Sequence, residues 1–302
     1  MPMQDETNNY WDDRCDLLAG MIMVRSVEKH LLDMFSRGLL SGTVHTCIGQ
    51  EACAIGVAAA IDPERDIIFS NHRGHGHYLG YCGDIDGLIA EVAGLPCGVC
   101  GGVGGSQHIR RNNFYTNGIQ GAGVPIVAGM ALAEKHKRSK AVSIVCLGDG
   151  TFGQGVVYEA MNIAALWQLP MIFMVENNGI AQTTPAGVQH AGDLAARAMP
   201  FGIPVTRIDG QDVDAVYEAS RAIFSEVREL VGPQMLFFDT CRFGPHSKGD
   251  DTRTAGEIAQ LRTRDPIFLK AERDGRTDKI EHMEEEWGRK LSKIEAMLFE
   301  KV

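Results

Sequence analysis

The sequence contains no apolar run of about 18 residues, which a transmembrane helix would require. It also lacks an excess of positive charge: its formal net charge at pH 7 is −10, and nucleic-acid phosphates would repel it. We therefore expect neither a membrane span nor a nucleic-acid partner. The first residues, MPMQDETNNYWDD, are acidic and polar, unlike a secretory signal or an Arg-rich transit peptide, so we expect a cytoplasmic protein.

A second pair of closely spaced cysteines is also missing. The eight cysteines are scattered, and only Cys97 and Cys100 form a Cys-x-x-Cys pair. A structural zinc site needs four ligands, and a thioredoxin-like motif would open a helix, whereas glycines surround this pair. A zinc or redox module would therefore rest on these two thiols alone. We expect a flexible glycine-rich loop with incidental thiols, and buried apolar roles for several of the other cysteines.

Segments with strand character alternate along the chain with segments of helical apolar spacing, an order typical of an α/β fold. The expected strands cover 67–70, 141–147 and 171–175, together with IPVTRIDG and QMLFFDTCRF. The expected helices cover 10–37 (as one or two helices), 49–61, 85–93, 124–137, 155–167 and 213–229. We therefore expect a doubly wound, mostly parallel sheet with helices on both faces.

After Pro266 the pattern changes to that of an amphipathic helix. Apolar residues recur at steps of three or four: Ile280, Met283, Trp287, Leu291, Ile294 and Leu298. The polar face carries both charge signs, so we expect this helix to dock on the protein body or on another subunit rather than on a membrane. The chain is thus expected to comprise an α/β domain over 1–266 and a C-terminal helical extension over 267–302.

The stretch GDGTFG (148–153) follows an expected strand and opens an expected helix, as a dinucleotide-binding Gly-x-Gly-x-x-Gly loop does. Glu176 even lies where a ribose-binding acid would be expected. Asp149, however, would repel a diphosphate by about 4 kcal/mol at about 4 Å and an effective dielectric of about 20. A divalent cation reverses that sign, and Mg²⁺ prefers carboxylates, phosphates and water as ligands. An NAD-dependent dehydrogenase is therefore the disfavoured alternative.

A second oxygen ligand is available at the next strand end. Asn178, in MIFMVENNGI, follows the expected strand 171–175 at the carboxyl edge of the sheet, where open α/β sheets bind ligands. Asn177–Asn178–Gly179 alone would also fit a simple turn. Beside Asp149, the amide oxygen of Asn178 favours a metal–diphosphate site.

The stretch GDGTFGQGVVYEAMNIAALWQLPMIFMVENN resembles the thiamine-diphosphate motif, which begins Gly-Asp-Gly and ends Asn-Asn. More narrowly, the chain resembles the alpha subunits of the two-subunit, thiamine-dependent 2-oxo acid dehydrogenases and acetoin dehydrogenases. The resemblance covers about 10–267 and includes GTVHTCIGQEAC, FSNHRGHGHYLG, GGVGGSQHI, NGIQGAGVPIVAGMALA, RIDGQDV and CRFGPHSKGDD. It implies the thiamine-diphosphate-binding fold, with thiamine diphosphate and Mg²⁺ as cofactors.

The resemblance assigns cofactor binding to residues of three motifs: His72, Arg73, Gly118, Gln120, Gly148, Asp149, Gly150, Thr151, Asn178 and Ile180. Among them, Asp149, Asn178 and the backbone carbonyl of Ile180 would ligate Mg²⁺. Gly150 and Thr151 would offer backbone contacts to the diphosphate. Gly148 and Gly150 are expected to form the tight turn of the loop.

Two of these motifs would hold the diphosphate and the aminopyrimidine ends of the cofactor. The Arg73 guanidinium suits diphosphate oxygens, with His72 beside it. Gly118 and Gln120 would meet the aminopyrimidine ring through the main chain. Taken without the resemblance, HRGHGH also fits a histidine-rich surface loop or a set of three metal ligands.

Two histidines are implied to be catalytic. His45 matches a residue near the substrate carbonyl, and His246 matches a residue on a loop that closes over the cofactor. Histidine suits both roles because its pKa lies near neutrality. Ser247 matches a site that kinases modify in mitochondrial relatives, although nothing in the sequence implies that control here.

The resemblance implies an enzyme that decarboxylates a small, pyruvate-like 2-oxo acid and passes the acyl group to a lipoyl-bearing acyltransferase component or another acceptor. An enzyme that cleaves acetoin, or a two-subunit carboligase of a biosynthetic pathway, would carry the same residues at these positions. His45 favours the pyruvate and acetoin branches, whereas 181–213 looks closer to the branched-chain subunits. The activating glutamate belongs to a beta subunit in this family, so the chain is expected to be inactive outside a heterotetramer of two alpha and two beta subunits.

Overall fold

The computed structural model describes residues 11, 14–40, 42–229, 231–247 and 249–300. Within these residues, seven strands form one sheet in the order β2-β3-β1-β4-β5-β9-β8, and all neighbours are parallel except β2 and β3. The strands are β1 (Ile67–Ser70), β2 (Arg110–Arg111), β3 (Phe114–Thr116), β4 (Ser143–Gly148), β5 (Met171–Asn177), β8 (Val205–Asp209) and β9 (Gln234–Asp239). A separate hairpin pairs β6 (Ile180–Ala181) with β7 (Thr184–Pro185).

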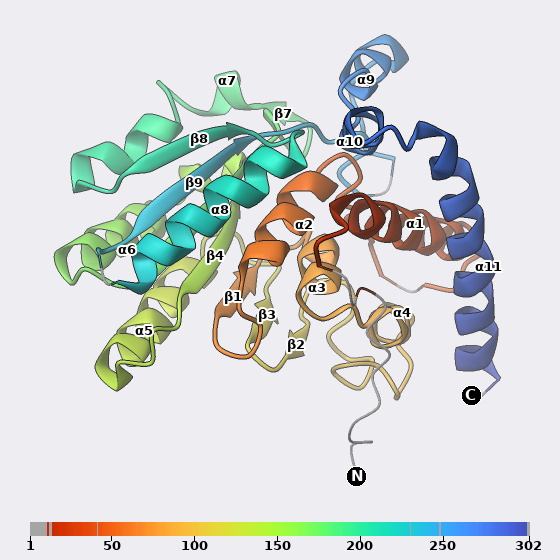
Figure 1. Cartoon of the computed structure of the whole chain (residues 1–302), viewed down its shortest axis with the longest axis horizontal. Coiled ribbons are helices and arrows are strands. Elements are labelled where there is room, and N and C mark those ends of the chain that lie inside the picture. Colours follow the sequence, from red (N-terminus) through yellow and green to blue (C-terminus); the bar gives the residue numbers. More distant parts are fainter. Residues whose placement is uncertain (1–10, 12–13, 41, 230, 248, 301–302) are drawn as a thin grey trace.

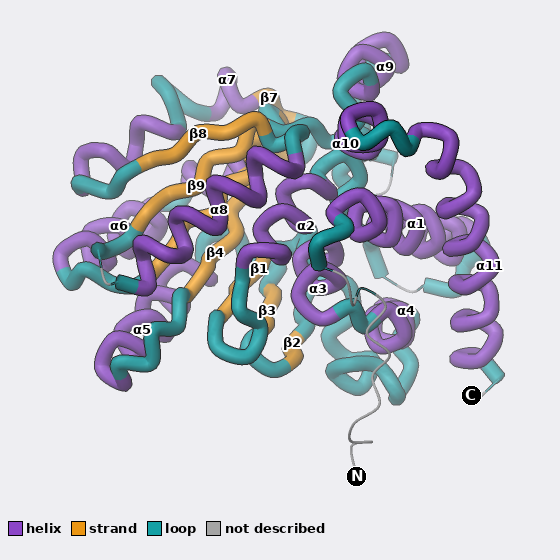
Figure 2. Tube along the Cα trace, in the orientation of Figure 1, coloured by secondary structure: helices purple, strands orange, loops and turns teal. Residues whose placement is uncertain are grey.

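Helices cover both faces of the sheet (Figures 1 and 2). They are α1 (Leu17–Ser36), α2 (Glu51–Ala60), α3 (His75–Cys82), α4 (Ile85–Val92), α5 (Gly123–Lys137), α6 (Gly155–Leu166), α7 (Ala186–Gln189), α8 (Val213–Arg228), α9 (Ala255–Arg262), α10 (Pro266–Arg273) and α11 (Ile280–Phe299). Successive strand residues point to opposite faces. Accordingly, Ile172 and Met174 pack in the core under α1, α2 and α8, whereas Phe173 and Val175 pack under α5 and α6. The predicted doubly wound α/β fold is confirmed.

The order of the strands places a reversal of winding beside β1. Strand β3 lies next to β1 on one side and β4 lies next to it on the other, so the chain crosses β1 when it passes from β3 to β4. Crevices outside the carboxyl ends of strands at such a point are the usual ligand sites of open α/β sheets. The segments that follow β1, β4 and β5 therefore meet at this edge.

Several short elements escaped the sequence prediction. HGHYLGYC forms α3, although its glycines suggest a loop, because its side chains are buried and tertiary packing outweighs helix propensity. The strands β2 and β3 and the hairpin β6–β7 are two or three residues long, too short for a periodic signal. The other predicted elements appear with ends shifted by a few residues, and the described part of 10–37 holds one helix, α1.

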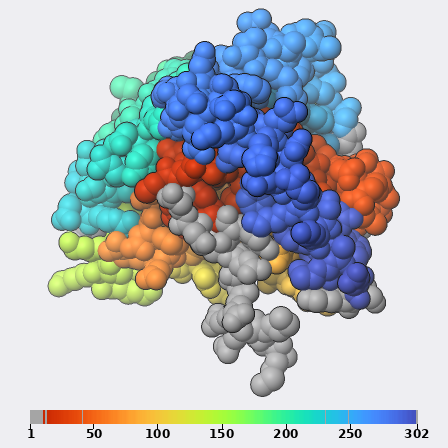
Figure 3. Space-filling view, turned by 45° about the vertical axis from the view of Figure 1, so that its right-hand side comes forward, coloured from red at the N-terminus to blue at the C-terminus, as the bar shows by residue number. Residues whose placement is uncertain are grey.

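The C-terminal helices pack on the N-terminal helix. Ile267 of α10 and Leu291, Ile294 and Leu298 of α11 lie in the same apolar core as α1, so the amphipathic helix docks on the protein body. Figure 3 shows α11 exposed along one side of the molecule. The domain boundary at 266 stays a prediction. No helix of the described residues has the length and apolarity to cross a membrane, and the cytoplasmic location also stays a prediction.

A buried ionic cluster joins α1, α2 and α10. Arg25 donates to both carboxylate oxygens of Glu51, and its Nη1 lies 2.9 Å from Asp265 Oδ2. Glu51 also accepts the Gly49 N–H at 2.9 Å, directly before Gln50, which lines the site described below. All three charged side chains are at least nine-tenths buried.

Replacing Arg25 by methionine should therefore destabilise the fold by about 3–5 kcal/mol, because it leaves two buried carboxylates without their cation. Urea denaturation followed by circular dichroism measures this change. The control is Arg65→Met, which removes a half-exposed partner of Asp62 and should have a much smaller effect. Equal losses in the two variants would contradict the prediction.

Candidate active site

A cavity of about 390 Å³ lies at the carboxyl edge of the sheet. All twelve residues predicted for the site line it: His45, His72, Arg73, Gly118, Gln120, Gly148, Asp149, Gly150, Thr151, Asn178, Ile180 and His246. His45 comes from the loop between α1 and α2. The others come from the end of β4 and from the segments after β1, β3, β4, β5 and β9, which the parallel sheet brings to one edge. The structure thus brings the predicted residues together, and the role of each stays a prediction.

Asp149 lies at the floor of this cavity, at the start of the short helix Asp149–Gly153 that follows β4. Its side chain is buried; Oδ1 accepts the Gly150 N–H at 2.8 Å, and Oδ2 has no partner among the described residues. Burial raises the pKa of this carboxyl, although the backbone N–H groups of Gly150 and Gly179 oppose the rise. A buried carboxylate oxygen without a donor fits a cation site.

Asn178 is held in place beside it. Its Nδ2 donates to Gln50 Oε1 at 3.0 Å, and its Oδ1 accepts the Ile180 N–H at 3.2 Å. The described residues contain no group of three or more His, Cys, Asp or Glu side chains that could hold a metal. A site made of one carboxylate, one amide and one carbonyl suits Mg²⁺, which keeps several waters and substrate oxygens, rather than zinc.

The structure shows why glycine stands in GDGTFG and where Glu176, the acid of the disfavoured dinucleotide alternative, lies. Neither Gly148 nor Gly150 has a positive φ, so the turn itself does not require glycine there. At Gly150 the requirement is space, because a Cβ would lie 2.6 Å from the Ala181 Cβ in the hairpin that follows β5. Glu176 is buried in the cavity wall, with Oε1 3.7 Å from His77 Nε2, rather than free to bind a ribose.

Two buried arginines lie near the cavity without carboxylate partners in the described structure. Arg73 donates to the Thr46 carbonyl at 2.6 Å and to His246 Nδ1 at 3.4 Å. Arg242 donates through Nη2 to the Gln182 carbonyl at 3.0 Å, while its Nε and Nη1 lack partners within the described residues. Burial and the Arg73 charge lower the pKa of Arg242 to about 10. Uncompensated guanidiniums of this kind indicate an anion site.

Three imidazole rings cluster in the cavity, and one of them, His246, contacts Arg73. The ring centroid of His45 lies 5.2 Å from that of His72 and 4.7 Å from that of His246. Each Nδ1 has a nitrogen donor within reach: Gln107 Nε2 at 2.9 Å from His45, Gln120 Nε2 at 2.8 Å from His72, and Arg73 Nη2 near His246. Burial and the Arg73 charge lower the pKa of all three, that of His45 to about 4. All three are therefore neutral at pH 7.

The alternatives left open for HRGHGH are not supported. His75 and His77 are buried in α3, so the segment is neither a surface loop nor a metal site. His75 Nδ1 pairs with Glu28 Oε2 at 3.1 Å, and His77 Nδ1 lies 2.8 Å from Ser70 Oγ.

The cavity also contains residues that the sequence analysis did not assign to the site, among them Gln50, Asn71, Gln107, Glu176 and Gln182. Gln50 and Asn71 adjoin predicted motifs, GQE and NHR, so position alone could have suggested them. Gln107 also lies in a motif of the resemblance, GGVGGSQHI, but nothing in that motif marks it as a site residue. Only the fold brings its segment and that of Gln182 to this edge.

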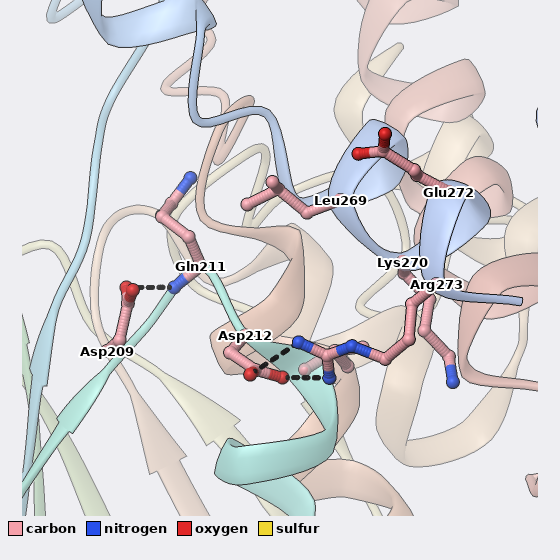
Figure 4. Close-up of a pocket in the computed structure, with 8 residues that line it drawn as sticks. Asp209, Gln211, Asp212, Leu269, Lys270, Glu272 and Arg273 are labelled. Carbon is pink, nitrogen blue, oxygen red and sulfur yellow. Dashed lines mark hydrogen bonds and ion pairs between the residues drawn. The ribbon is translucent and has the colours of Figure 1, made fainter.

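A second cavity, of about 430 Å³, lies between the start of α8 and α10 (Figure 4). Its charged side chains are largely paired with one another. Arg273 Nη2 lies 2.7 Å from Asp212 Oδ2, and Lys270 Nζ lies 2.9 Å from Asp214 Oδ1. This cavity is comparable in size to the first, but its paired charges leave little to attract a ligand.

The comparisons with known proteins agree with this geometry. The family described as "Dehydrogenase E1 component" matches residues 19–286. The chain belongs to this family. It is an alpha-type E1 subunit of the thiamine-diphosphate-dependent dehydrogenases, of the pyruvate or acetoin type, and the family predicted from the sequence is confirmed.

Three relatives illustrate the similarity. The alpha subunit of the pyruvate dehydrogenase E1 component of Zymomonas mobilis is 41% identical over 253 residues, covering 81% of this chain and 71% of the relative. The alpha subunit of the Bacillus subtilis acetoin:2,6-dichlorophenolindophenol oxidoreductase is 39% identical over 234 residues, 76% and 70% of the two chains. The somatic mitochondrial pyruvate dehydrogenase E1 alpha subunit of Homo sapiens is 37% identical over 258 residues, 84% and 66%.

The lowered pKa of His45 makes the stability of this E1 chain depend on pH. In the unfolded chain His45 takes up a proton below its ordinary pKa of about 6.5, whereas in the folded chain it does so only near pH 4. The free energy of unfolding therefore falls as the pH falls between these two values. Without Mg²⁺ or phosphate, we expect His45→Asn to lose less stability than the wild type between about pH 7 and about pH 5. Urea titrations at both pH values measure the difference. Parallel losses would show that His45 titrates normally.

Proposed function

We propose that the cavity binds thiamine diphosphate through Mg²⁺ and that the enzyme decarboxylates a small, pyruvate-like 2-oxo acid. The buried, unpartnered Oδ2 of Asp149 carries this proposal, because it needs a cation in a cavity that buried arginines make attractive to an anion. Mg²⁺ held by Asp149, Asn178 and the Ile180 carbonyl would satisfy that oxygen. Arg73 would hold the diphosphate, with Gly150, Thr151 and His72 beside it.

When bound, thiamine diphosphate would supply a nucleophilic carbon and take up the electrons of the bond that breaks. The residues of the chain would bind the substrate and move protons. His45, neutral at pH 7, can donate an N–H to a carbonyl oxygen. His246 can transfer a proton as the acyl group passes to a lipoyl arm or another acceptor. Gly118 and Gln120 line the part of the cavity proposed for the aminopyrimidine ring.

A beta subunit is part of the proposal, in a heterotetramer of two alpha and two beta subunits. Both bacterial relatives named above are alpha subunits by name. Large apolar side chains are exposed next to lining residues: Ile119 between Gly118 and Gln120, and Val188 before Gln189. A further hollow of about 210 Å³ between α5 and α6 is lined mainly by Pro125, Gly129, Val156, Ile163 and Trp167. Exposed apolar surface of this kind is typical of subunit interfaces.

The relatives point to two kinds of substrate, 2-oxo acids and acetoin. Acetoin cleavage is the second candidate, because two of the relatives are acetoin oxidoreductase subunits by name. The test is to co-express the chain with a cognate beta subunit and to assay pyruvate, branched 2-oxo acids and acetoin with an artificial electron acceptor. We expect the highest kcat/KM with pyruvate. A clear preference for acetoin would shift the assignment, and inactivity towards all three in the presence of both cofactors would overturn it.

A further inference from the structure

The glycine-rich loop over 98–105 is organised around one buried carboxylate, Glu91 at the end of α4. Its Oε2 accepts the backbone N–H groups of Cys100 at 2.6 Å and Gly102 at 3.0 Å. Its Oε1 accepts those of Gly104 at 2.8 Å and Gly105 at 3.1 Å. Hydrogen bonds to an ionised acceptor are stronger than neutral ones. The loop that was expected to be flexible is therefore pinned to the body of the protein.

The loop held by Glu91 places the next two residues, Ser106 and Gln107, beside His75 and His45. Ser106 Oγ lies 2.9 Å from Nε2 of the buried His75, whose Nδ1 contacts Glu28. Gln107 enters the active-site cavity, where its Nε2 lies 2.9 Å from His45 Nδ1. The side chain of Gln107 thus reaches the ring that we place next to the substrate carbonyl.

The contact between Gln107 and His45 determines which ring nitrogen carries the proton. An amide nitrogen only donates, so His45 Nδ1 must accept, and the proton of the neutral ring lies on Nε2. We propose that Gln107 is a positioning residue that holds His45 as the Nε2-protonated tautomer, with its N–H available to an oxygen of the substrate. This inference rests on the proposed function for the role of His45, but not for the tautomer itself.

The space that Gln107 occupies depends on Gly118. A Cβ at position 118 would lie 2.3 Å from Gln107 Oε1, a distance that would displace the amide. Gly118 was expected to contact the cofactor through its main chain. The absence of a side chain there also leaves room for the Gln107 amide against His45. The two expected halves of the site, cofactor and substrate, are therefore linked through this glutamine.

The charges around His45 make its tautomer important for proton donation. Among the described residues, Arg73, His246 and His75 disfavour a positive charge on the ring, and Asp250 favours one. A ring that stays neutral can act as a proton donor only through the nitrogen that carries its single proton. A wrong tautomer can cost several orders of magnitude in kcat in enzymes that depend on a neutral histidine.

The test uses two variants with opposite chemistry. Gln107→Met keeps the length of the side chain but cannot donate, and Gln107→Glu introduces an acceptor that favours a proton on Nδ1. In ¹⁵N-histidine NMR spectra of the full chain, with His45→Asn to assign the signal, the wild type should show Nε2–H. Gln107→Met should show a mixture, and Gln107→Glu a protonated Nδ1. Gln260→Met, an exposed change on α9, is the matched control and should leave the spectrum unchanged.

In the assembled enzyme, kcat should fall about 10-fold in Gln107→Met and about 100-fold in Gln107→Glu, with a smaller change in KM. An unchanged His45 tautomer in both variants would overturn the inference, whatever the activity. An altered tautomer with unchanged kcat would overturn the positioning role. An altered tautomer in an assembly that cleaves none of the substrates would uphold the Gln107 contact and count against the proposed function instead.

Discussion

Asp149→Ala is expected to weaken Mg²⁺-dependent binding of thiamine diphosphate more than about 100-fold, since changes around a metal ligand alone cost 10- to 100-fold. The same change removes a buried carboxylate oxygen that has no donor among the described residues. An unsatisfied buried polar atom costs about 1–3 kcal/mol. The chain without cofactors should therefore be at least as stable after the substitution as before it.

The two halves of this prediction are measured separately. Isothermal titration calorimetry of the assembled enzyme, with and without Mg²⁺, gives the affinity, and urea denaturation of the chain gives the stability. Asp33→Asn is the control, because Asp33 is exposed on α1 and pairs with Arg37 on the same helix. It should change neither quantity appreciably. Retained Mg²⁺-dependent binding in Asp149→Ala would refute the cofactor assignment, and a large loss of stability would show that Asp149 has a structural partner.

The charge pattern of one short motif was enough to predict the centre of the site. In GDGTFG the glycines alone favour a dinucleotide loop, whereas Asp149 favours a metal between the protein and a diphosphate. The strands β4 and β5 around it are six and seven residues long and mostly apolar, long enough to be recognised. Since they are neighbours and parallel, Asp149 and Asn178 necessarily emerge at the same edge of the sheet.

Other features depend on contacts that no local pattern encodes. His75 and His77 look like surface histidines beside glycines, but Glu28 and Ser70 accommodate them inside the protein. Gln107 reaches His45 across 62 positions of sequence, and the loop that carries it is held by Glu91. Likewise, Arg242 is recognised as a cation near the cavity only when its burial and its missing partners are known. Such residues follow from tertiary packing, so the sequence predicted the cofactor-binding loop better than the residues around the substrate.

The purified chain without a beta subunit is expected to turn over its substrate at least about 10³-fold more slowly than the assembled enzyme. Among the described residues, Asp149 and Glu176 are the two acids that line the cavity. Asp149 belongs to the proposed metal site, and Glu176 is buried next to His77. Within the described structure neither is hydrogen-bonded to Gly118 or Gln120, where the aminopyrimidine ring is proposed to bind. Proton transfer by a positioned acid or base contributes about 10²–10⁴-fold, and we propose that the beta subunit supplies that carboxylate.

Titrating the beta subunit into the purified chain, with Mg²⁺ and thiamine diphosphate in excess, measures this dependence. Activity should rise from background and saturate at one beta subunit per chain. The apolar side chains of Ile119 and Val188, exposed at 67% and 80%, should become covered in the complex, which hydrogen exchange of their segments would detect. Trp167→Ala, in the hollow between α5 and α6, should weaken assembly without altering the fold of the isolated chain, since this side chain is half-exposed. Measurable turnover by the chain alone would show that it carries its own activating group.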